Sequence, residues 1–222
     1  MAIINHTWKF IFVHIPKCGG TTVSHALEPL CTWRDLVLGG TEFGEVCQVA
    51  YQKRFNISKH SRSNEIRSVV GAALWERYST FSIVRHPVAR TISTFRYLKH
   101  HADTYQFIEE FDTIEDFVLS DQWSKSGPDR MFLPQHTWTH SPSGSLLVDR
   151  FIKLEQIQSG LLDFLEKTGI PPNKISKIQL GHKNKMPYDP EDLAPDVVKA
   201  IQSKYKDDLA LFGYWDWTSG GN

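Results

Sequence analysis

Short apolar runs alternate with amphipathic stretches along this chain, and each pattern predicts one type of element. The apolar runs predict strands at residues 10–15, 54–57, 80–84 and 146–153. The stretches with helical periodicity predict helices at residues 22–27, 64–76, 88–99, 113–120, 156–168 and 195–211. Alternating strands and helices are typical of an α/β fold with a central parallel sheet and helices on both faces. No repeat and no linker interrupts the pattern, which predicts a single domain over residues 1–222.

A glycine-rich loop follows the first predicted strand. It reads Pro16-Lys17-Cys18-Gly19-Gly20-Thr21-Thr22 and runs into a predicted helix. The two glycines permit a tight turn, and the helix N-terminus directs N–H groups and a positive dipole end at the loop. One ammonium and two hydroxyls complete a set of donors for an anion. The sequence therefore predicts that this loop binds a phosphate or a sulfate.

Two well-known phosphate sites do not match this loop. A Walker A loop carries its lysine after the last glycine, whereas Lys17 precedes Gly19 and Gly20. A cysteine-dependent phosphatase would use Cys18 as its nucleophile with an arginine six positions later, but that position is Ser24. A plain strand-turn-helix without function is the remaining alternative. It leaves the lysine and the threonines unexplained.

A second basic segment lies at residues 79–100. A β-branched predicted strand is followed directly by Arg85 and then by a predicted helix that carries Arg90 and Ser93. Because Arg85 ends the strand and Ser93 lies two turns into the helix, both can reach one ligand at the edge of the sheet. The alternative is that these arginines only form a solvated helix face.

Together the two segments resemble the sulfotransferases that use 3′-phosphoadenosine 5′-phosphosulfate (PAPS), in particular the branch with Golgi carbohydrate O-sulfotransferases and their bacterial relatives. The resemblance covers most of the chain, with further similar pieces at residues 59–81, 133–138, 148–157 and 205–214. It implies a P-loop-like three-layer fold. In that family the first loop holds the 5′-phosphosulfate, and an arginine followed eight positions later by a serine holds the 3′-phosphate. The resemblance thus assigns donor binding to Lys17, Cys18, Gly19, Gly20, Thr21, Thr22, Arg85 and Ser93, with Arg90 as a helper.

The resemblance also implies a reaction. A sulfuryl group would pass from PAPS to a hydroxyl of a carbohydrate or small metabolite by in-line displacement, with release of adenosine 3′,5′-bisphosphate (PAP). Lys17 would stabilise the charge on the leaving phosphate, and no metal would be required because the cationic loop takes the place of magnesium in kinases. His60 is the candidate general base, since it follows a predicted strand end and histidine titrates near neutral pH. His86 and His136 are the alternatives.

Two other classes of function remain open from the sequence. One is a P-loop-like nucleotide kinase, for which ATP should bind better than PAP. The other is a non-catalytic nucleotide-binding protein on the same fold, which should bind PAP without turnover of any acceptor.

The composition of the chain limits the kinds of binding partner and the cellular location that we expect. The 222 residues include 25 Lys and Arg against 25 Asp and Glu, and this zero net charge argues against nucleic acid as a partner. No apolar run approaches a membrane span. The three cysteines lack metal spacing and favour reduced thiols in a cytoplasmic enzyme. His136 and His140 lack a third ligand, so we expect no metal site there.

Overall fold

A computed structural model describes residues 2–120, 122–124, 127, 130–178, 180 and 193–214. The described residues group into two compact units. The first unit comprises residues of Met1–Val84 and Thr137–Met186, and the second comprises residues of Arg85–His136 and Pro187–Asn222. The single domain expected over residues 1–222 stays a prediction.

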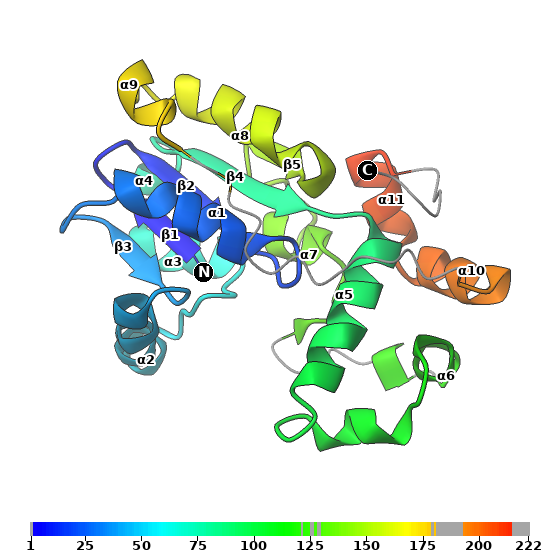
Figure 1. The fold of residues 1–222 in the computed structure, drawn as a ribbon. Helices are drawn as coiled ribbons and strands as arrows, with labels where there is room; N and C mark the ends of the chain where they lie inside the picture. The colour runs from blue at the N-terminus through cyan, green and yellow to red at the C-terminus, as the bar shows by residue number, and fades with distance from the viewer. Residues whose placement is uncertain are drawn as a thin grey trace. The chain divides into compact units, whose positions relative to one another are not determined.

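The first unit contains a five-stranded sheet with the order β3-β1-β2-β4-β5 (Figure 1). Its strands are β1 (Ala2–Asn5), β2 (Phe10–Val13), β3 (Leu36–Leu38), β4 (Ser79–Val84) and β5 (Arg150–Lys153). β4 pairs in parallel with β2 and with β5, whereas β1 pairs antiparallel with β2 and β3. The α/β prediction with a parallel central sheet is therefore confirmed. The antiparallel strands β1 and β3 were not predicted.

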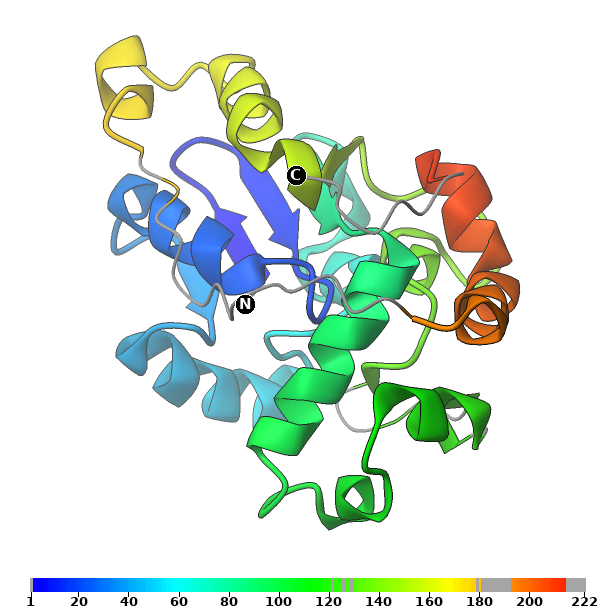
Figure 2. The same ribbon diagram turned by 45° about the vertical axis from the view of Figure 1, so that its right-hand side comes forward.

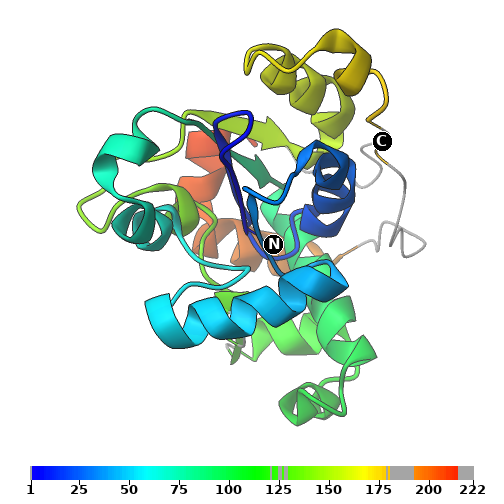
Figure 3. The same ribbon diagram turned by 90° about the vertical axis from the view of Figure 1, so that its left-hand side faces the viewer.

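Helices cover both faces of this sheet (Figure 3). α1 (Gly20–Leu27) and α8 (Ile157–Glu166) lie on one face, and α3 (Ser63–Val70) and α4 (Ala72–Trp75) lie on the other. Every residue of β2 is buried, as expected for an interior strand covered on both sides. Phe81 of β4 stacks on Phe12 of β2 with ring centroids 4.9 Å apart, and Phe164 of α8 packs on Phe81 at 4.3 Å. These aromatic contacts join the central strands to their helical layer.

The strand predicted at residues 54–57 was wrong. This region ends a helix, α2 (Glu42–Phe55), which the sequence pattern did not predict. The Thr41 side chain caps its N-terminus, and Asn56 ends it in the left-handed conformation with φ of 55°. Gly44 is its only buried residue, so α2 has no continuous apolar face toward a core from which periodicity could identify it.

Three predicted elements are shorter or divided. Gly71, with φ of 86° and ψ of 147°, separates α3 from α4 within the helix predicted at residues 64–76. The helix predicted at 195–211 divides at Tyr205 into α10 (Pro195–Lys204) and α11 (Lys206–Phe212). β5 begins at Arg150 rather than at residue 146.

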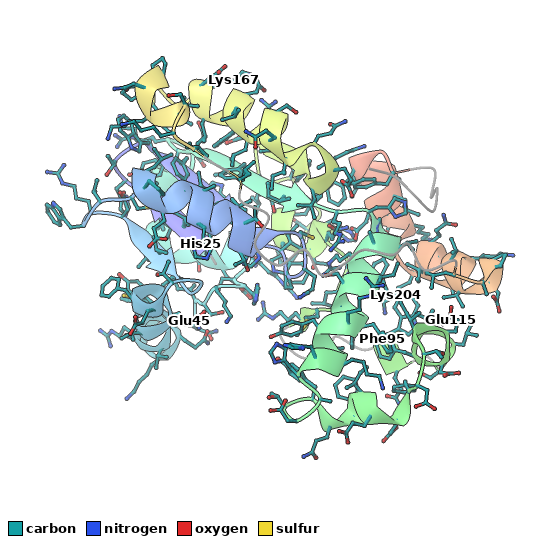
Figure 4. The ribbon with its side chains drawn as sticks, viewed as in Figure 1. His25, Glu45, Phe95, Glu115, Lys167 and Lys204 are labelled. Carbon is teal, nitrogen blue, oxygen red and sulfur yellow. The ribbon has the colours of Figure 1, made fainter. Side chains whose placement is uncertain are left out.

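The second unit is helical. Its described helices include α5 (Pro87–His100), η2 (Gln106–Glu110), α6 (Ile114–Leu119), η3 (Gln122–Ser124), α10 and α11. α10 packs against α5 and α6, and Figure 4 labels Phe95 on α5, Glu115 on α6 and Lys204 on α10. The ammonium of Lys204 lies 4.7 Å from the centroid of the buried Trp123 ring.

Short helices complete the described elements: η1 (Glu28–Leu30), α7 (His136–Thr139), η5 (Leu154–Gln156) and α9 (Pro172–Ile175). Of these, η1 directly follows α1, and η5 leads from β5 into α8.

Asp149 joins β4 to β5 at their start, which generates a stability prediction. Its Oδ2 accepts hydrogen bonds from Thr80 N at 2.7 Å and Thr80 Oγ1 at 2.9 Å, and Thr80 is only 1% exposed. We expect Asp149→Ala to lower the free energy of unfolding by about 1 to 3 kcal/mol, because it leaves buried donors unsatisfied. Urea denaturation measures the loss. Asp163→Ala is the control, since that carboxylate pairs with Arg150 and Lys167 at the surface. Equal losses in both variants would contradict the role of Asp149.

Candidate active site

The predicted anion loop connects β2 to α1 (Figure 2). Lys17 has φ of 64° and Gly19 has φ of 74°, so two loop residues occupy the left-handed region. This region is sparsely populated by residues other than glycine, and such strained positions cluster at functional sites. The Cys18 N–H donates to the Ile15 carbonyl at 3.4 Å and closes the turn. The loop thus holds Lys17 in a conformation that local sequence preference alone would not select.

Close packing at Gly20 and the left-handed main chain at Gly19, with φ of 74°, both favour glycine. A Cβ atom at Gly20 would lie 1.7 Å from Nε2 of His14, and a Cβ atom at Gly19 would lie 2.4 Å from Cδ1 of Leu154. The ring of His14 therefore occupies the space that any side chain at residue 20 would need. As a result, the start of α1 lies directly against this imidazole.

The predicted anion-binding residues lie in the loop and in the first turn of α1, and their role as donors to an anion stays a prediction. α1 begins at Gly20 with Gly19 as its N-cap, so the positive end of the helix dipole opens into the loop. Lys17 and Thr22 are half-buried and Thr21 is exposed. Cys18 is fully buried, and its thiol lies 3.7 Å from the Pro16 carbonyl inside the loop. An ammonium, hydroxyls and a helix N-terminus together suit a phosphate or sulfate group.

His60 lies beside this loop, although not at a strand end as expected. It belongs to a turn after α2, and its ring centroid is 4.7 Å from that of His14 with an interplanar angle of 43°. The indole N–H of Trp138 donates to the His60 carbonyl at 3.1 Å. Sequence analysis missed His14. Its position directly after an apolar strand and before the glycine loop was the available signal.

The turn that carries His60 is anchored on α2. Lys59 N donates to Oε1 of Gln48 at 3.2 Å, and Lys59 Nζ lies 3.3 Å from Oε1 of Glu45. Glu45, which Figure 4 labels on α2, also accepts from Gly40 N at 2.9 Å. The helix that periodicity did not reveal therefore fixes the main chain next to the candidate base.

Burial keeps both histidines neutral. It lowers the pKa of His14 and of His60 well below the usual value, and the positive charges of Lys59 and Lys17 lower both further. A hydrogen bond with the His14 main chain acts in the opposite direction on His60 and raises its pKa. Since Nδ1 of His60 is buried without a hydrogen-bond partner among the described residues, this bond uses Nε2. Nδ1 then carries the lone pair.

The residues predicted to hold a 3′-phosphate belong to the second unit. Arg85 lies two residues before the start of α5, whose N-cap is His86. Ser93 lies within α5, and both Arg85 and Ser93 are half-buried. Arg90 is 2% exposed and donates from Nη1 to the Leu133 carbonyl at 2.8 Å and from Nη2 to the Met131 carbonyl at 2.9 Å. The Arg90 guanidinium is therefore hydrogen-bonded to the main chain of the segment that follows residue 130.

The two alternative bases also lie in the second unit. His86 is 5% exposed and accepts from Val88 N through Nδ1 at 3.2 Å, which caps α5. His136 Nδ1 lies 2.8 Å from Oδ1 of Asp208, whose carboxylate is fully buried. The hydrogen bond to Asp208 raises the pKa of His136, and burial opposes it. The bond to Asp208 therefore orients the imidazole of His136, and the pKa of His136 is raised whereas that of His60 is lowered.

The structure thus brings Lys17 to Thr22 together with His14 and His60 in one unit. It places Arg85, Arg90, Ser93 and His136 in the other. In the parts of the chain that the structure describes, no group of three or more His, Cys, Asp or Glu residues is placed to hold a metal ion.

The buried histidines predict a pH dependence of stability. Below about pH 6.5 the unfolded state binds more protons than the folded state, because the folded pKa values of His14 and His60 are lowered. Stability should therefore be complete above about pH 6.5 and fall as the pH drops toward those folded values. The contribution of His136 to stability depends on pH in the opposite direction. It is complete below about pH 6.5 and is lost as the pH rises through the raised pKa of His136 in the folded state.

Urea denaturation between about pH 5 and pH 8 measures both effects. His14→Gln should make the loss below about pH 6.5 shallower, because glutamine does not titrate. His136→Gln should leave that loss and remove the decline at higher pH. An acid slope that is unchanged in His14→Gln would contradict a buried neutral imidazole.

We compared the chain with protein families, curated proteins and solved structures. Neither the curated proteins nor the solved structures that we compared gave a match to the chain. No helix in the described part of the chain has the length and apolarity needed to cross a bilayer. The model of the sulfotransferase family matches residues 1–215, which is nearly the whole sequence. On this match, the chain belongs to the sulfotransferase family.

Proposed function

We propose that this sulfotransferase uses PAPS as its donor and transfers the sulfuryl group to a hydroxyl of a carbohydrate or small metabolite. The observation that carries the proposal is the loop with its strained main chain at Lys17, which opens into α1 against a buried pair of neutral histidines. An anion-binding loop beside a neutral imidazole is the combination that sulfuryl transfer to a hydroxyl requires.

The loop residues suit the 5′ end of this donor. Lys17 supplies a positive charge, Thr21 and Thr22 supply hydroxyls, and the N-terminus of α1 supplies dipole and N–H groups. Gly19 and Gly20 let the main chain pack closely against Leu154 and His14, and Cys18 fills the interior of the loop. PAPS, when bound, supplies a sulfuryl group that is activated by its bond to phosphate.

Two residues have distinct roles in the transfer. Lys17 stabilises the negative charge that develops on the oxygen between sulfur and the 5′-phosphate as the S–O bond breaks. His60, through Nδ1, accepts the proton that the acceptor hydroxyl loses as its oxygen bonds to sulfur. The products are the sulfated acceptor and PAP, with the proton left on His60.

Arg85 and Ser93 are proposed to hold the 3′-phosphate. Both are half-buried, and the guanidinium of an arginine forms strong charge-assisted hydrogen bonds with phosphate oxygens. Arg90 was predicted as a helper, and its bonds to the Leu133 and Met131 carbonyls suit support of this region through the main chain. The acceptor class, a cytoplasmic location and independence from metal rest on the sequence alone.

The proposal predicts that Arg85 distinguishes ligands by their 3′-phosphate. PAP at a hundredfold excess over its Kd should stabilise the wild-type fold by about 2.7 kcal/mol in a thermal-shift experiment. Arg85→Ala should weaken PAP by about 1.5 to 3 kcal/mol and should change adenosine 5′-phosphosulfate, which lacks the 3′-phosphate, much less.

Lys17→Ala is the matched control for this experiment, because it should weaken both ligands through the 5′-phosphate group that they share. Equal losses of both ligands in Arg85→Ala would refute the 3′-phosphate role. ATP that binds much more tightly than PAP would instead support a nucleotide kinase.

The identity of the base predicts where the acid limb of kcat/KM lies. With His60 as base, the limb should lie well below pH 6.5, since burial lowers the pKa of this residue. His60→Ala should then lower kcat by about 10² to 10⁴ and leave PAP affinity nearly unchanged. With His136 as base, the limb should lie above pH 6.5 and disappear in His136→Gln. That result would move the base to His136 and leave the sulfotransferase assignment standing.

A further inference from the structure

The main chain of Arg85 is held by a side chain distant in sequence. Gln135 is fully buried, and its Oε1 accepts from Arg85 N at 2.9 Å while its Nε2 donates to the Arg85 carbonyl at 2.8 Å. One amide group therefore pairs with both polar groups of one residue, as a neighbouring strand would. Fixing the N–H and the C=O of Arg85 together restricts its φ and ψ, and these angles set the direction of its Cα–Cβ bond.

Gln135 is itself held by a buried carboxylate. Asp208 of α11 is fully buried, and Oδ2 accepts from Gln135 N at 2.6 Å while Oδ1 accepts from His136 N at 2.9 Å. Oδ1 is also 2.8 Å from His136 Nδ1. A buried carboxylate is destabilising unless hydrogen bonds and charge compensate it, and these three donors provide that compensation.

The same segment is tied down on its other side by Arg90. Its guanidinium donates to the Met131 and Leu133 carbonyls, which precede Gln135 by four and two residues. Residues 131–136 are thus held by Arg90 of α5 and by Asp208 of α11. The position of the Gln135 amide is therefore set by two buried charged groups rather than by a free loop.

We propose that Gln135 and Asp208 are positioning residues that aim Arg85 at the 3′-phosphate of the donor. The inference rests on the proposed role of Arg85. An arginine side chain has several rotatable bonds, so its ability to form geometrically specific bonds with phosphate depends on a fixed starting direction. Gln135 provides that direction without touching the ligand, and Asp208 holds Gln135.

Binding of PAP and of adenosine 5′-phosphosulfate tests this role by isothermal titration calorimetry. Gln135→Met has nearly the same volume and removes both bonds to Arg85. We expect it to weaken PAP roughly tenfold and adenosine 5′-phosphosulfate less than about twofold. Asp208→Asn, which loses one of the two acceptor oxygens, should show the same selective loss. It tests the proposal independently if Gln135→Met does not fold.

Tyr205→Phe is the matched control, because the Tyr205 hydroxyl donates to the Phe132 carbonyl at 2.9 Å in the same segment without contacting Arg85. It should lower Tm and leave the ratio of the two affinities unchanged. In an Arg85→Ala background, Gln135→Met should change PAP affinity less than about twofold, since its effect passes through Arg85.

The outcomes separate the two proposals. If Arg85→Ala itself shows no selective loss of PAP, the proposed function of Arg85 fails and this inference fails with it. If Arg85→Ala is selective but Gln135→Met and Asp208→Asn weaken both ligands equally or neither, only the positioning role is overturned. A full tenfold effect of Gln135→Met in the Arg85→Ala background would also overturn it.

Discussion

The contact between the His14 ring and the backbone of Gly20 is the constraint on which the candidate site depends. Because a Cβ atom at residue 20 would lie 1.7 Å from the imidazole, only glycine permits α1 to begin where it does. The same ring packs on Phe12 of β2 and on His60. One buried side chain thus relates the central strand, the start of the loop helix and the candidate base. Its neutral state is part of the arrangement, since a charged imidazole here would face Lys17 and Lys59.

The candidate residues of the first unit lie against buried neutral imidazole rings, whereas those of the second unit are held by buried charged groups. Asp208 holds the main chain at Gln135 and His136, and Arg90 holds the carbonyls just before them. Buried ionic groups of this kind contribute little net stability compared with apolar packing, but they specify one geometry because any displaced partner leaves a charge unsatisfied. In the second unit, the main chain that is fixed in this way lies next to Arg85, which is hydrogen-bonded to Gln135.

The sequence by itself determined the α/β class, the glycine-containing turn between β2 and α1 and the family, because these depend on local patterns: buried apolar runs, glycine spacing and a helix start. The sequence also placed the candidate base His60 at a strand end, but that residue lies in a turn after α2, and its role as base stays a prediction. Only the tertiary structure decided which residues contact one another around the candidate site residues. The contact of His14 with Gly20 and the bonds of Gln135 to Arg85 join residues whose separation along the chain carries no periodic signal. The pKa shifts likewise exist only in the folded chain, because burial lowers the pKa of His60 whereas the hydrogen bond to Asp208 raises that of His136.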